Sequence, residues 1–355
     1  MFKRKTYLDH PGIQTVDLTD SVSNWERYHL EDLNIFYAED FAKDPLEILK
    51  HIKTLTDFDE DQLLYIHSVQ DWLKFDASVL KLKFQRSVIE STISFLYEKL
   101  TKEPNMVITM KEAFVIQKVK RFIAAYDRLL SEIQDHHRQL KSYEGVYSRF
   151  ICGFADLCCL ETVNISKTEQ TTWTNLRGNS QVRSRFPFLQ AWTSTGKNRY
   201  MCFNCQGKEQ NDNKKKARKT AAKKEKNENT DSKGHNRRRP VYSTEDKHAP
   251  PLILDITNER VIGQHGGELL LNLNKFYGDL ETDTLTLPGM IVIETSVIFT
   301  LLEMSKKHLE KLKNNDELDN QDEATIYYSP PYDILCEESR NILIENFMRL
   351  NNVNV

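Results

Sequence analysis

Two cysteines stand at the spacing of a metal-binding pair. Cys202 and Cys205 are separated by Phe203 and Asn204, which gives a C-x2-C pattern. When the residues between them form a turn, two thiolates at this spacing can bind one zinc ion. A structural zinc site needs four ligands, so a distant part of the chain must supply a second pair. The alternative interpretation is two reduced cysteines on a strand beside a loop.

These four residues resemble the opening of a retroviral-type zinc knuckle. The resemblance ends there, because Gln206-Gly207-Lys208-Glu209 stands where the knuckle has Gly-His and then a third cysteine. It implies zinc only if other residues complete the site, and without them we expect no cofactor. The residues that could complete it are His235, His248, and Cys158 together with Cys159.

Three carboxylates indicate a different chemistry, the metal-assisted hydrolysis of phosphodiesters. Asp255 ends an apolar run, Glu268 opens another, and Glu294 follows the strand-like residues 290–293. Nucleases hold divalent metal ions with acidic side chains at strand ends, and a lysine lies near the scissile phosphate. A restriction-endonuclease-like pattern would carry that lysine in an E-x-K motif, but no lysine stands two residues after Glu294. The catalytic hypothesis is a nuclease-like or other hydrolase with a degenerate acidic metal site; solvation alone also places carboxylates at strand ends.

Residues 208–240 concentrate the positive charge of the chain. They hold thirteen lysines and arginines against five carboxylates, whereas the whole chain has a formal net charge of −3. Such a block stays solvated and attracts polyanions or a nuclear-import receptor. The sequence predicts a disordered basic loop over residues 207–240 that is a nuclear localisation signal or a nucleic-acid tether. Its two clusters are Lys214, Lys215, Lys216, Arg218 and Lys219, followed by Arg237, Arg238 and Arg239.

The composition is typical of a soluble globular protein. Of the 355 residues, 39% are hydrophobic and 28% are charged. No apolar run approaches the ~20 residues of a membrane-spanning helix. No apolar run follows the N-terminal basic residues either, so we expect no secretory signal. Six cysteines are too few for a disulfide scaffold. We therefore expect a nuclear protein, with the cytoplasm as the alternative, and no membrane partner.

Helical patterns dominate residues 41–160, after a segment (residues 1–40) that we expect to be an extended arm. Pro45 fits the first turn of a helix, and residues 59–72 continue the helical pattern. Residues 115–140 follow a heptad pattern, in which spacings of four and three alternate. This seam is typical either of a coiled coil that joins two copies of the protein or of a helix packed inside its own chain. It consists of Val115, Val119, Phe122, Tyr126, Leu129, Ile133, His136 and Leu140.

Residues 161–355 mix strand-like and helical patterns around the basic loop. Because apolar strand-like sequence flanks the loop on both sides, we expect the loop to leave a sheet rather than to join two independent domains. Residues 296–312 and 337–350 have helical spacings. The runs typical of strands include Leu252 to Ile256, Val261 to Ile262 and the alternating Leu269, Leu271 and Leu273, with Gly263, Gly266 and Gly267 as turn residues between them.

The predicted fold is α+β, with a helix-rich N-terminal half that contains one long heptad helix. A mixed α+β half follows, interrupted by the basic insertion. The leading functional prediction is a nuclear binding or scaffold protein, and the nuclease-like hydrolase is the alternative.

Overall fold

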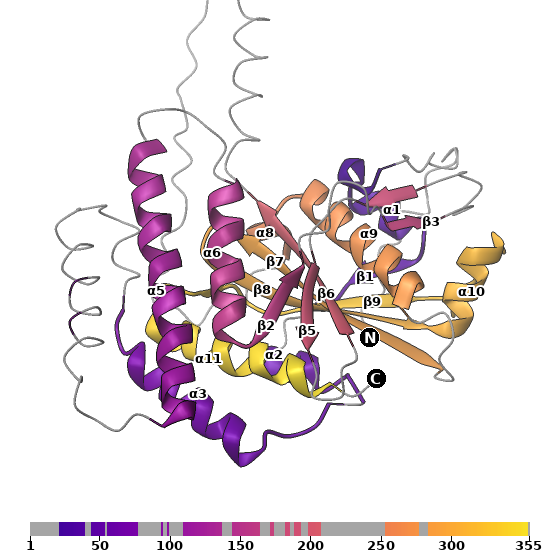
Figure 1. The fold of residues 1–355 in the computed structure, drawn as a ribbon. Helices are drawn as coiled ribbons and strands as arrows, with labels where there is room; N and C mark the ends of the chain where they lie inside the picture. The colour runs from indigo at the N-terminus through magenta and orange to yellow at the C-terminus, as the bar shows by residue number, and fades with distance from the viewer. Residues whose placement is uncertain are drawn as a thin grey trace, which may run out of the picture.

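A mixed β-sheet runs through the molecule, and helices cover both of its faces (Figure 1). The predicted α+β class is therefore confirmed. Helices also dominate the N-terminal half, as the sequence predicts. The computed structural model describes residues 21–39, 44–53, 55–76, 94, 98, 109–136, 144–163, 171–173, 182–184, 188–192, 198–206, 253–276 and 283–353.

Local capping interactions explain where several helices begin. Asp44 accepts a hydrogen bond from the backbone N–H of Glu47 at 3.1 Å, directly before Pro45. Asp59 and Gln62 each accept from the other's backbone N–H, which forms a capping box. The described helices are α1 (Arg27–Glu31), α2 (Pro45–Leu49), α3 (Glu60–Trp72), α5 (Met110–His136), α6 (Glu144–Leu157), α8 (Ile253–Ile256), α9 (Glu259–Phe276), α10 (Lys306–Asn314) and α11 (Glu337–Arg349), with the 3₁₀ turns η2 (Val22–Asn24) and η4 (Leu350–Asn352).

The sheet has the strand order β1-β9-β8-β7-β6-β5-β2, and β10 extends it by pairing with β8. The pairs β1–β9 and β6–β7 are parallel, and the other neighbours in this order are antiparallel. Strands β3 and β4 form a separate two-stranded sheet. The strands are β1 (Ile35–Tyr37), β2 (Leu160–Val163), β3 (Thr171–Trp173), β4 (Val182–Ser184), β5 (Phe188–Trp192), β6 (Asn198–Gln206), β7 (Thr284–Ile293), β8 (Ser296–Ser305), β9 (Ala324–Tyr328) and β10 (Tyr332–Asp333).

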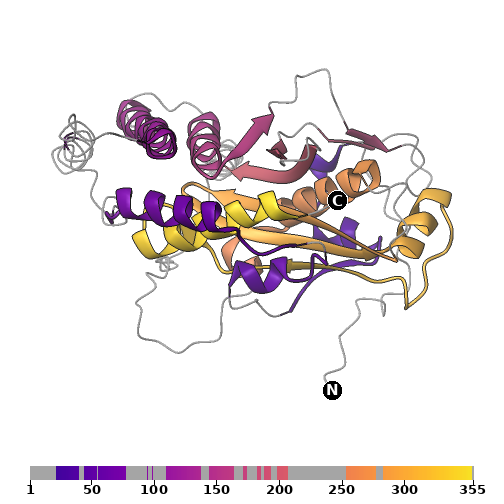
Figure 2. The same cartoon turned by 60° about the horizontal axis from the view of Figure 1, so that its bottom comes forward.

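Two hydrophobic cores lie on opposite faces of the sheet. On β8, Val297 and Phe299 belong to one core, whereas Ile298 and Leu302 belong to the other. This alternation follows from the two-residue period of a strand. The first core is completed by α2, α3, α5, α6 and α11, and Figure 2 shows α3 beside α11. The second core is completed by η2, α1, α9 and α10.

The heptad helix α5 packs inside its own chain. Val119, Phe122 and Tyr126 are each at most 2% exposed, and α5 lies beside α6 in Figure 1. Ile123 and Leu130 are also buried although they lie outside the seam. A stripe this wide is typical of a helix in a globular core rather than of a two-stranded coiled coil. For Val115 to Leu129, the bundle-type interpretation is therefore confirmed; the side chains of Ile133, His136 and Leu140 lie outside the described set.

Part of the predicted extended arm is folded into the core. Residues 21–38 form η2, α1 and β1, and Trp25 is completely buried. Strand β1 pairs in parallel with β9 and so supplies one end of the sheet. The sequence patterns did not predict these elements because they are too short to show a helical or strand period. The elements on which they pack also lie far away, in the C-terminal part of the chain.

The strand-like runs after the basic loop are helical, which corrects the sequence prediction. Residues 253–256 form α8, and residues 259–276 form the single helix α9. Every residue from 261 to 273 is buried, so this part of the helix has no solvent-exposed face to mark a helical period. Without such a face, a buried helix and a buried strand have similar apolar patterns.

The three glycines that the sequence analysis assigned to turns lie inside α9, where they allow other elements to approach the helix. A Cβ at Gly263 would clash with the backbone of Glu26, and one at Gly266 would clash with Leu30. At Gly267, a Cβ would lie 2.6 Å from the indole ring of Trp25. These glycines therefore let α1 and the preceding residues pack directly on the α9 backbone.

Candidate functional site

Helix α9 carries a group of buried polar side chains into the second core. Gln264 is 8% exposed, and His265, Glu268 and Asn272 are at most 1% exposed. They are neighbours on the helix because residues four apart lie one turn from each other. Burying polar groups costs free energy unless hydrogen bonds compensate, so their bonding determines what this cluster can do.

His265 joins α9 to the centre of the sheet. Its Nε2 atom lies 2.8 Å from the hydroxyl oxygen of Thr300 on β8. Complete burial lowers the pKa of His265 to about 3, so the imidazole is neutral at physiological pH. Its Nδ1 atom has no hydrogen-bond partner among the described residues. A neutral ring that is enclosed in this way can position α9 on the sheet, and acid should weaken that role.

Glu268, one of the three predicted catalytic carboxylates, belongs to this cluster. Its Oε1 atom accepts a hydrogen bond from Gln264 Nε2 at 3.1 Å. The Asn272 side chain donates to the Glu268 backbone carbonyl at 2.7 Å. The side chain of Glu268 is completely buried, and its hydrogen bond ties two successive turns of α9 together.

The structure places only one of the three predicted carboxylates at the end of a strand. Asp255 is exposed on α8 and Glu268 is buried in α9, so two of the three positions are helical. Only Glu294 follows a strand, in the β7–β8 turn with φ of 59°. Within the described residues, no three histidine, cysteine or acidic side chains gather as a metal site. The strand-end arrangement on which the nuclease hypothesis rested is wrong for Asp255 and Glu268.

The cysteine pair lies in a strand rather than in a turn. Cys202 and Cys205 both belong to β6, where they pair in register with Gly289 and Val292 of β7. Positions three apart in a strand fall on opposite faces of a sheet. The local turn that the zinc hypothesis requires is therefore not formed by residues 202–205.

The predicted basic-loop residues lie outside the described part of the chain. The last residue described before the loop is Gln206, at the end of β6, and the first after it is Ile253, at the start of α8. The residues concerned are Lys214, Lys215, Lys216, Arg218, Lys219, Arg237, Arg238 and Arg239.

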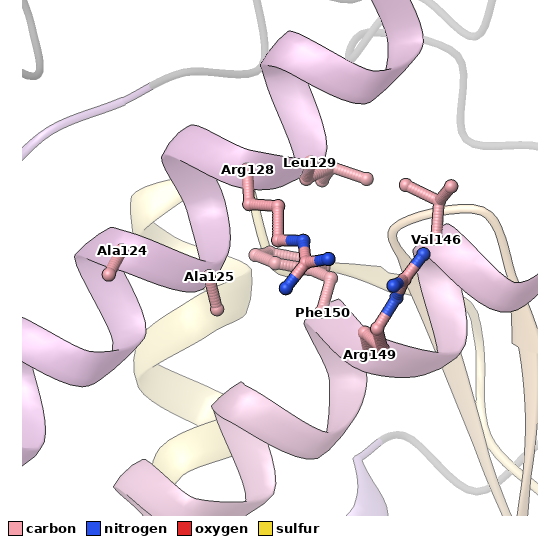
Figure 3. A pocket seen from close by; sticks show the side chains of 7 residues that line it. All are labelled: Ala124, Ala125, Arg128, Leu129, Val146, Arg149 and Phe150. Atoms are coloured by element: carbon pink, nitrogen blue, oxygen red, sulfur yellow. The ribbon is translucent and has the colours of Figure 1, made fainter. Parts of the chain in front are cut away.

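A pocket between α5 and α6 brings together two arginines, Arg128 and Arg149, that the sequence patterns did not single out. It has a volume of about 250 Å³. Figure 3 shows the guanidinium groups of Arg128 on α5 and Arg149 on α6 extending into the space between the two helices. The remaining lining is apolar and consists of Ala124, Ala125, Leu129, Val146 and Phe150.

The packing of α5 on α6 explains how this pocket forms. The helices approach closely at the pocket residue Ala125, where a Cβ added to Gly153 would lie 2.7 Å from the Ala125 Cβ. Small side chains at this contact leave the longer side chains of Arg128 and Arg149 at the mouth of the pocket, where both are exposed. Leu129 and Phe150 are at most 2% exposed and close the space from the core side.

The heptad analysis missed Arg128 because it assigned helix contacts to the seam alone. Arg128 precedes the seam residue Leu129, and Ala125 precedes Tyr126. Helix α6 packs on this flank of the seam. Adjacent small and basic residues beside a seam are too common to be recognised as a pocket from the sequence.

Comparisons with protein-family models, with curated proteins and with solved structures each found no match for this chain. Within the described ranges, no helix is both long enough and apolar enough to cross a membrane.

Proposed function

We propose that the protein is a nuclear binding or scaffold protein, with its basic segment as the docking point for an import receptor or for nucleic acid. One observation carries the proposal: residues 208–240 contain thirteen lysines and arginines against five carboxylates, in a chain of formal net charge −3. A charge distribution this uneven favours polyanionic or acidic partners for one segment only. The cytoplasm remains the alternative location.

The positions of the elements next to this segment support its role as a projecting appendage. Strand β6 pairs with β7 inside the sheet, and α9, which follows α8, packs on the same sheet. The chain thus leaves and re-enters one folded unit. A partner held by the basic segment would stay close to that unit, which is the arrangement expected of a scaffold.

The binding proposed for the segment is electrostatic rather than sequence-specific. Lysine and arginine side chains that neutralise phosphates release condensed counterions, and this affinity falls steeply with salt. Residues 208–240 contain no Phe, Tyr or Trp, so they offer no aromatic platform for stacked bases. An import receptor would recognise the same two clusters through its acidic surface.

Self-association through the heptad helix over residues 115–140 is a further part of the proposal, but among the described seam residues those from Val115 to Leu129 are not available for it. The seam residues from Val115 to Leu129 are covered by the chain's own elements. A second copy could not reach them without unfolding this core.

Neutralising the two clusters tests the import proposal. We would follow the tagged full chain in cells after glutamine replaces every basic residue of one cluster, residues 214–219 or residues 237–239, or of both clusters. Loss of nuclear enrichment is the expected result. The matched control is Lys53→Gln with Lys120→Gln and Lys307→Gln, three exposed lysines of the described part. An unchanged distribution in the variant lacking both clusters would refute the import proposal.

Binding of a labelled duplex to the purified chain tests the tether proposal separately. The logarithm of the binding constant should fall with the logarithm of salt concentration, with a slope of about −0.9 for each phosphate neutralised. The variant lacking both clusters should bind more weakly and with a shallower slope. If it binds as the unmodified chain does, the segment is not the tether.

A further inference from the structure

We propose that an open part of the sheet, at His51, Glu303 and Tyr327, binds one unpaired base of a single-stranded nucleic acid. This inference rests on the proposed function, because it names the kind of nucleic acid that the basic segment would hold. The ligand class is a single strand that carries an accessible guanine.

The face of the sheet that carries the first core is open beyond Leu301 of β8. Leu301 is completely buried, whereas Glu303, the next residue on this face, keeps 32% of its side chain exposed. Glu303 is in register with Thr286 on β7 and with Thr325 on β9. Residues directly opposite one another share a face of the sheet, and both threonines are half-buried. Two hydroxyl side chains therefore flank one carboxylate on an accessible stretch of the sheet.

Two stacked rings lie beside this carboxylate. Helix α2 packs on β8 and β9, and the ring centroid of His51, which follows α2, lies 4.3 Å from that of Tyr327 on β9. His51 Nδ1 lies 3.2 Å from Glu303 Oε2, and this contact orients the imidazole. The His51 side chain is still 39% exposed, so a third flat ring can extend the stack on the solvent side.

An unpaired base fits this combination of groups. Proteins that bind single strands stack the bases on aromatic side chains, histidine included, and form hydrogen bonds to the base edges. His51 supplies the ring, and Glu303 supplies an acceptor beside it. Among the described residues, the Glu303 carboxylate accepts a hydrogen bond only from His51, which leaves Oε1 for a ligand. Lys50, next to His51, is exposed and can pair with a phosphate of the strand.

The basic segment is long enough to hold a strand at this surface. The chain leaves the sheet after Gln206, which pairs with Ile293 beside the start of β8. Glu303 lies seven residues along β8 from Ser296, or about 23 Å. A loop of residues 207–252 reaches roughly 75 Å from its two anchors when it is extended at ~3.3 Å per residue. One strand can therefore contact the basic clusters and the stacked rings together.

The carboxylate predicts which base is preferred. Guanine presents two adjacent N–H donors on its Watson–Crick edge, and the two oxygens of a carboxylate can accept from both. Adenine and cytosine each place a ring nitrogen acceptor beside their amino group, and this lone pair would face the negative charge. Hypoxanthine lacks the 2-amino group of guanine but has the same rings. We therefore expect guanine to bind more tightly than hypoxanthine or adenine.

Fluorescence anisotropy with labelled oligothymidine strands of equal length tests the proposal. The strands differ in a single central base, which is guanine, hypoxanthine or adenine. Because all three carry the same charge, the electrostatic contribution to binding is the same for each. The full chain should bind the guanine strand about tenfold more tightly than the other two, as expected for one bidentate contact. Absent binding, or equal binding of the three strands, would overturn the proposal.

Variants connect the preference to the surface. Glu303→Gln should remove the preference for guanine, and His51→Ala should weaken binding of the guanine strand by about tenfold, since one stacked base loses its partner. The matched controls are Glu310→Gln and His67→Ala, an exposed carboxylate on α10 and an exposed imidazole on α3, and both should bind as the original chain does. Thermal unfolding shows that each variant is folded. A folded Glu303→Gln chain that still prefers guanine would refute the surface.

The variant lacking both basic clusters separates this surface from the tether. If it binds every strand as the original chain does and keeps the guanine preference, the tether proposal is wrong and the surface proposal stands. If it binds every strand more weakly while the original chain shows no base preference, the tether stands and the surface proposal is wrong. Loss of affinity with the guanine preference retained supports both.

Discussion

The indole ring of Trp25 lies against the backbone of α9 at Gly267, where a Cβ would come within 2.6 Å of ring carbon Cε3. Gly267→Ala should therefore destabilise the protein by about 1–3 kcal/mol, the usual cost of overpacking a core. The substitution also has a stabilising effect of ~1 kcal/mol, because alanine is more favourable than glycine inside a helix. We expect the cost of overpacking to exceed this gain. Urea denaturation measures the change in the free energy of unfolding.

A double-mutant cycle with Trp25→Leu separates the clash from other effects of the substitution. Removing the indole ring opens space beside position 267, so Gly267→Ala should cost less when it is combined with Trp25→Leu than when it is made alone. Equal costs with and without the indole ring would contradict the close contact.

Arg340 joins α11 to the chain that follows α3 and should be difficult to replace. It is completely buried and donates to the carbonyls of Ile334, Leu73 and Phe75. Its guanidinium carbon also lies 4.3 Å from the ring centroid of Phe75. Arg340→Gln leaves several of these acceptors without a donor, and we expect a loss of about 3 kcal/mol or more in the free energy of unfolding.

The matched control for Arg340 is Arg27→Gln on α1. Arg27 is 45% exposed and pairs with Glu31 one turn away. Exposed helical pairs of this kind contribute about 0.3–0.5 kcal/mol. Both variants are compared in the same denaturant titration. If Arg27→Gln and Arg340→Gln lose similar amounts of unfolding free energy, the buried contacts of Arg340 do not stabilise the fold.

Acid should destabilise the protein through His265. Burial lowers its pKa to about 3 from an ordinary value of 6.5, so between these values the unfolded state binds a proton that the folded state does not. The contribution of neutral His265 to the free energy of unfolding is therefore complete above pH 6.5, and it falls as the pH decreases toward 3. Between pH 7.5 and pH 5, this residue should cost about 2 kcal/mol of unfolding free energy.

Two variants isolate the contribution of the imidazole. His265→Gln should make the loss of stability between pH 7.5 and pH 5 smaller by about that amount. Thr300→Val removes the hydroxyl that lies 2.8 Å from the ring but keeps the imidazole, so it should retain the pH dependence of the original chain. If His265→Gln loses as much stability in acid as the original chain does, the imidazole is not the group responsible.

Phe122 should stabilise the single chain rather than a dimer. Its ring centroid lies 5.7 Å from those of Phe150 and Phe154 on α6. Phe122→Ala should cost about 3–5 kcal/mol, and Phe114→Ala, at a site that is 46% exposed, should cost much less. Thermal unfolding at several protein concentrations measures both. A coiled-coil dimer would instead make the loss depend on protein concentration.

The sequence predicts elements well where local signals agree. Helix α3 begins after Asp59, whose capping box with Gln62 is a local signal. The predicted helix over residues 337–350 is present as α11 (Glu337–Arg349). Both helices place one face on the core and leave the other partly exposed, so the helical period is visible in their residue types.

Sequence patterns fail where an element is buried on more than one side. The helix predicted over residues 296–312 is divided between β8 and α10. Strand β8 is paired on both edges and covered on both faces, so its residues are almost continuously apolar and show no alternation. The predicted position of Glu268 at a strand end was wrong for the same reason. Its apolar run was assigned to a strand, but these residues form the buried helix α9.

The pocket of Arg128 and Arg149 could not be predicted, because it depends on how two helices approach one another. Neither arginine belongs to a motif. Their proximity results from the close contact between Ala125 and Gly153, which is a tertiary relationship without a local signature.

The contacts of the N-terminal segment have a consequence for synthesis of the chain. His308 Nε2 lies 2.9 Å from the carbonyl oxygen of Leu33, 275 residues earlier in the chain. At ribosomal rates of about 5–20 residues per second, that partner emerges roughly 15 to 55 s later. For most of this interval, until residues 259–276 have been made, Trp25 and Leu30 lack the α9 surface that covers them in the folded protein. A newly made chain therefore presents an apolar N-terminal segment that chaperones can bind before folding is complete.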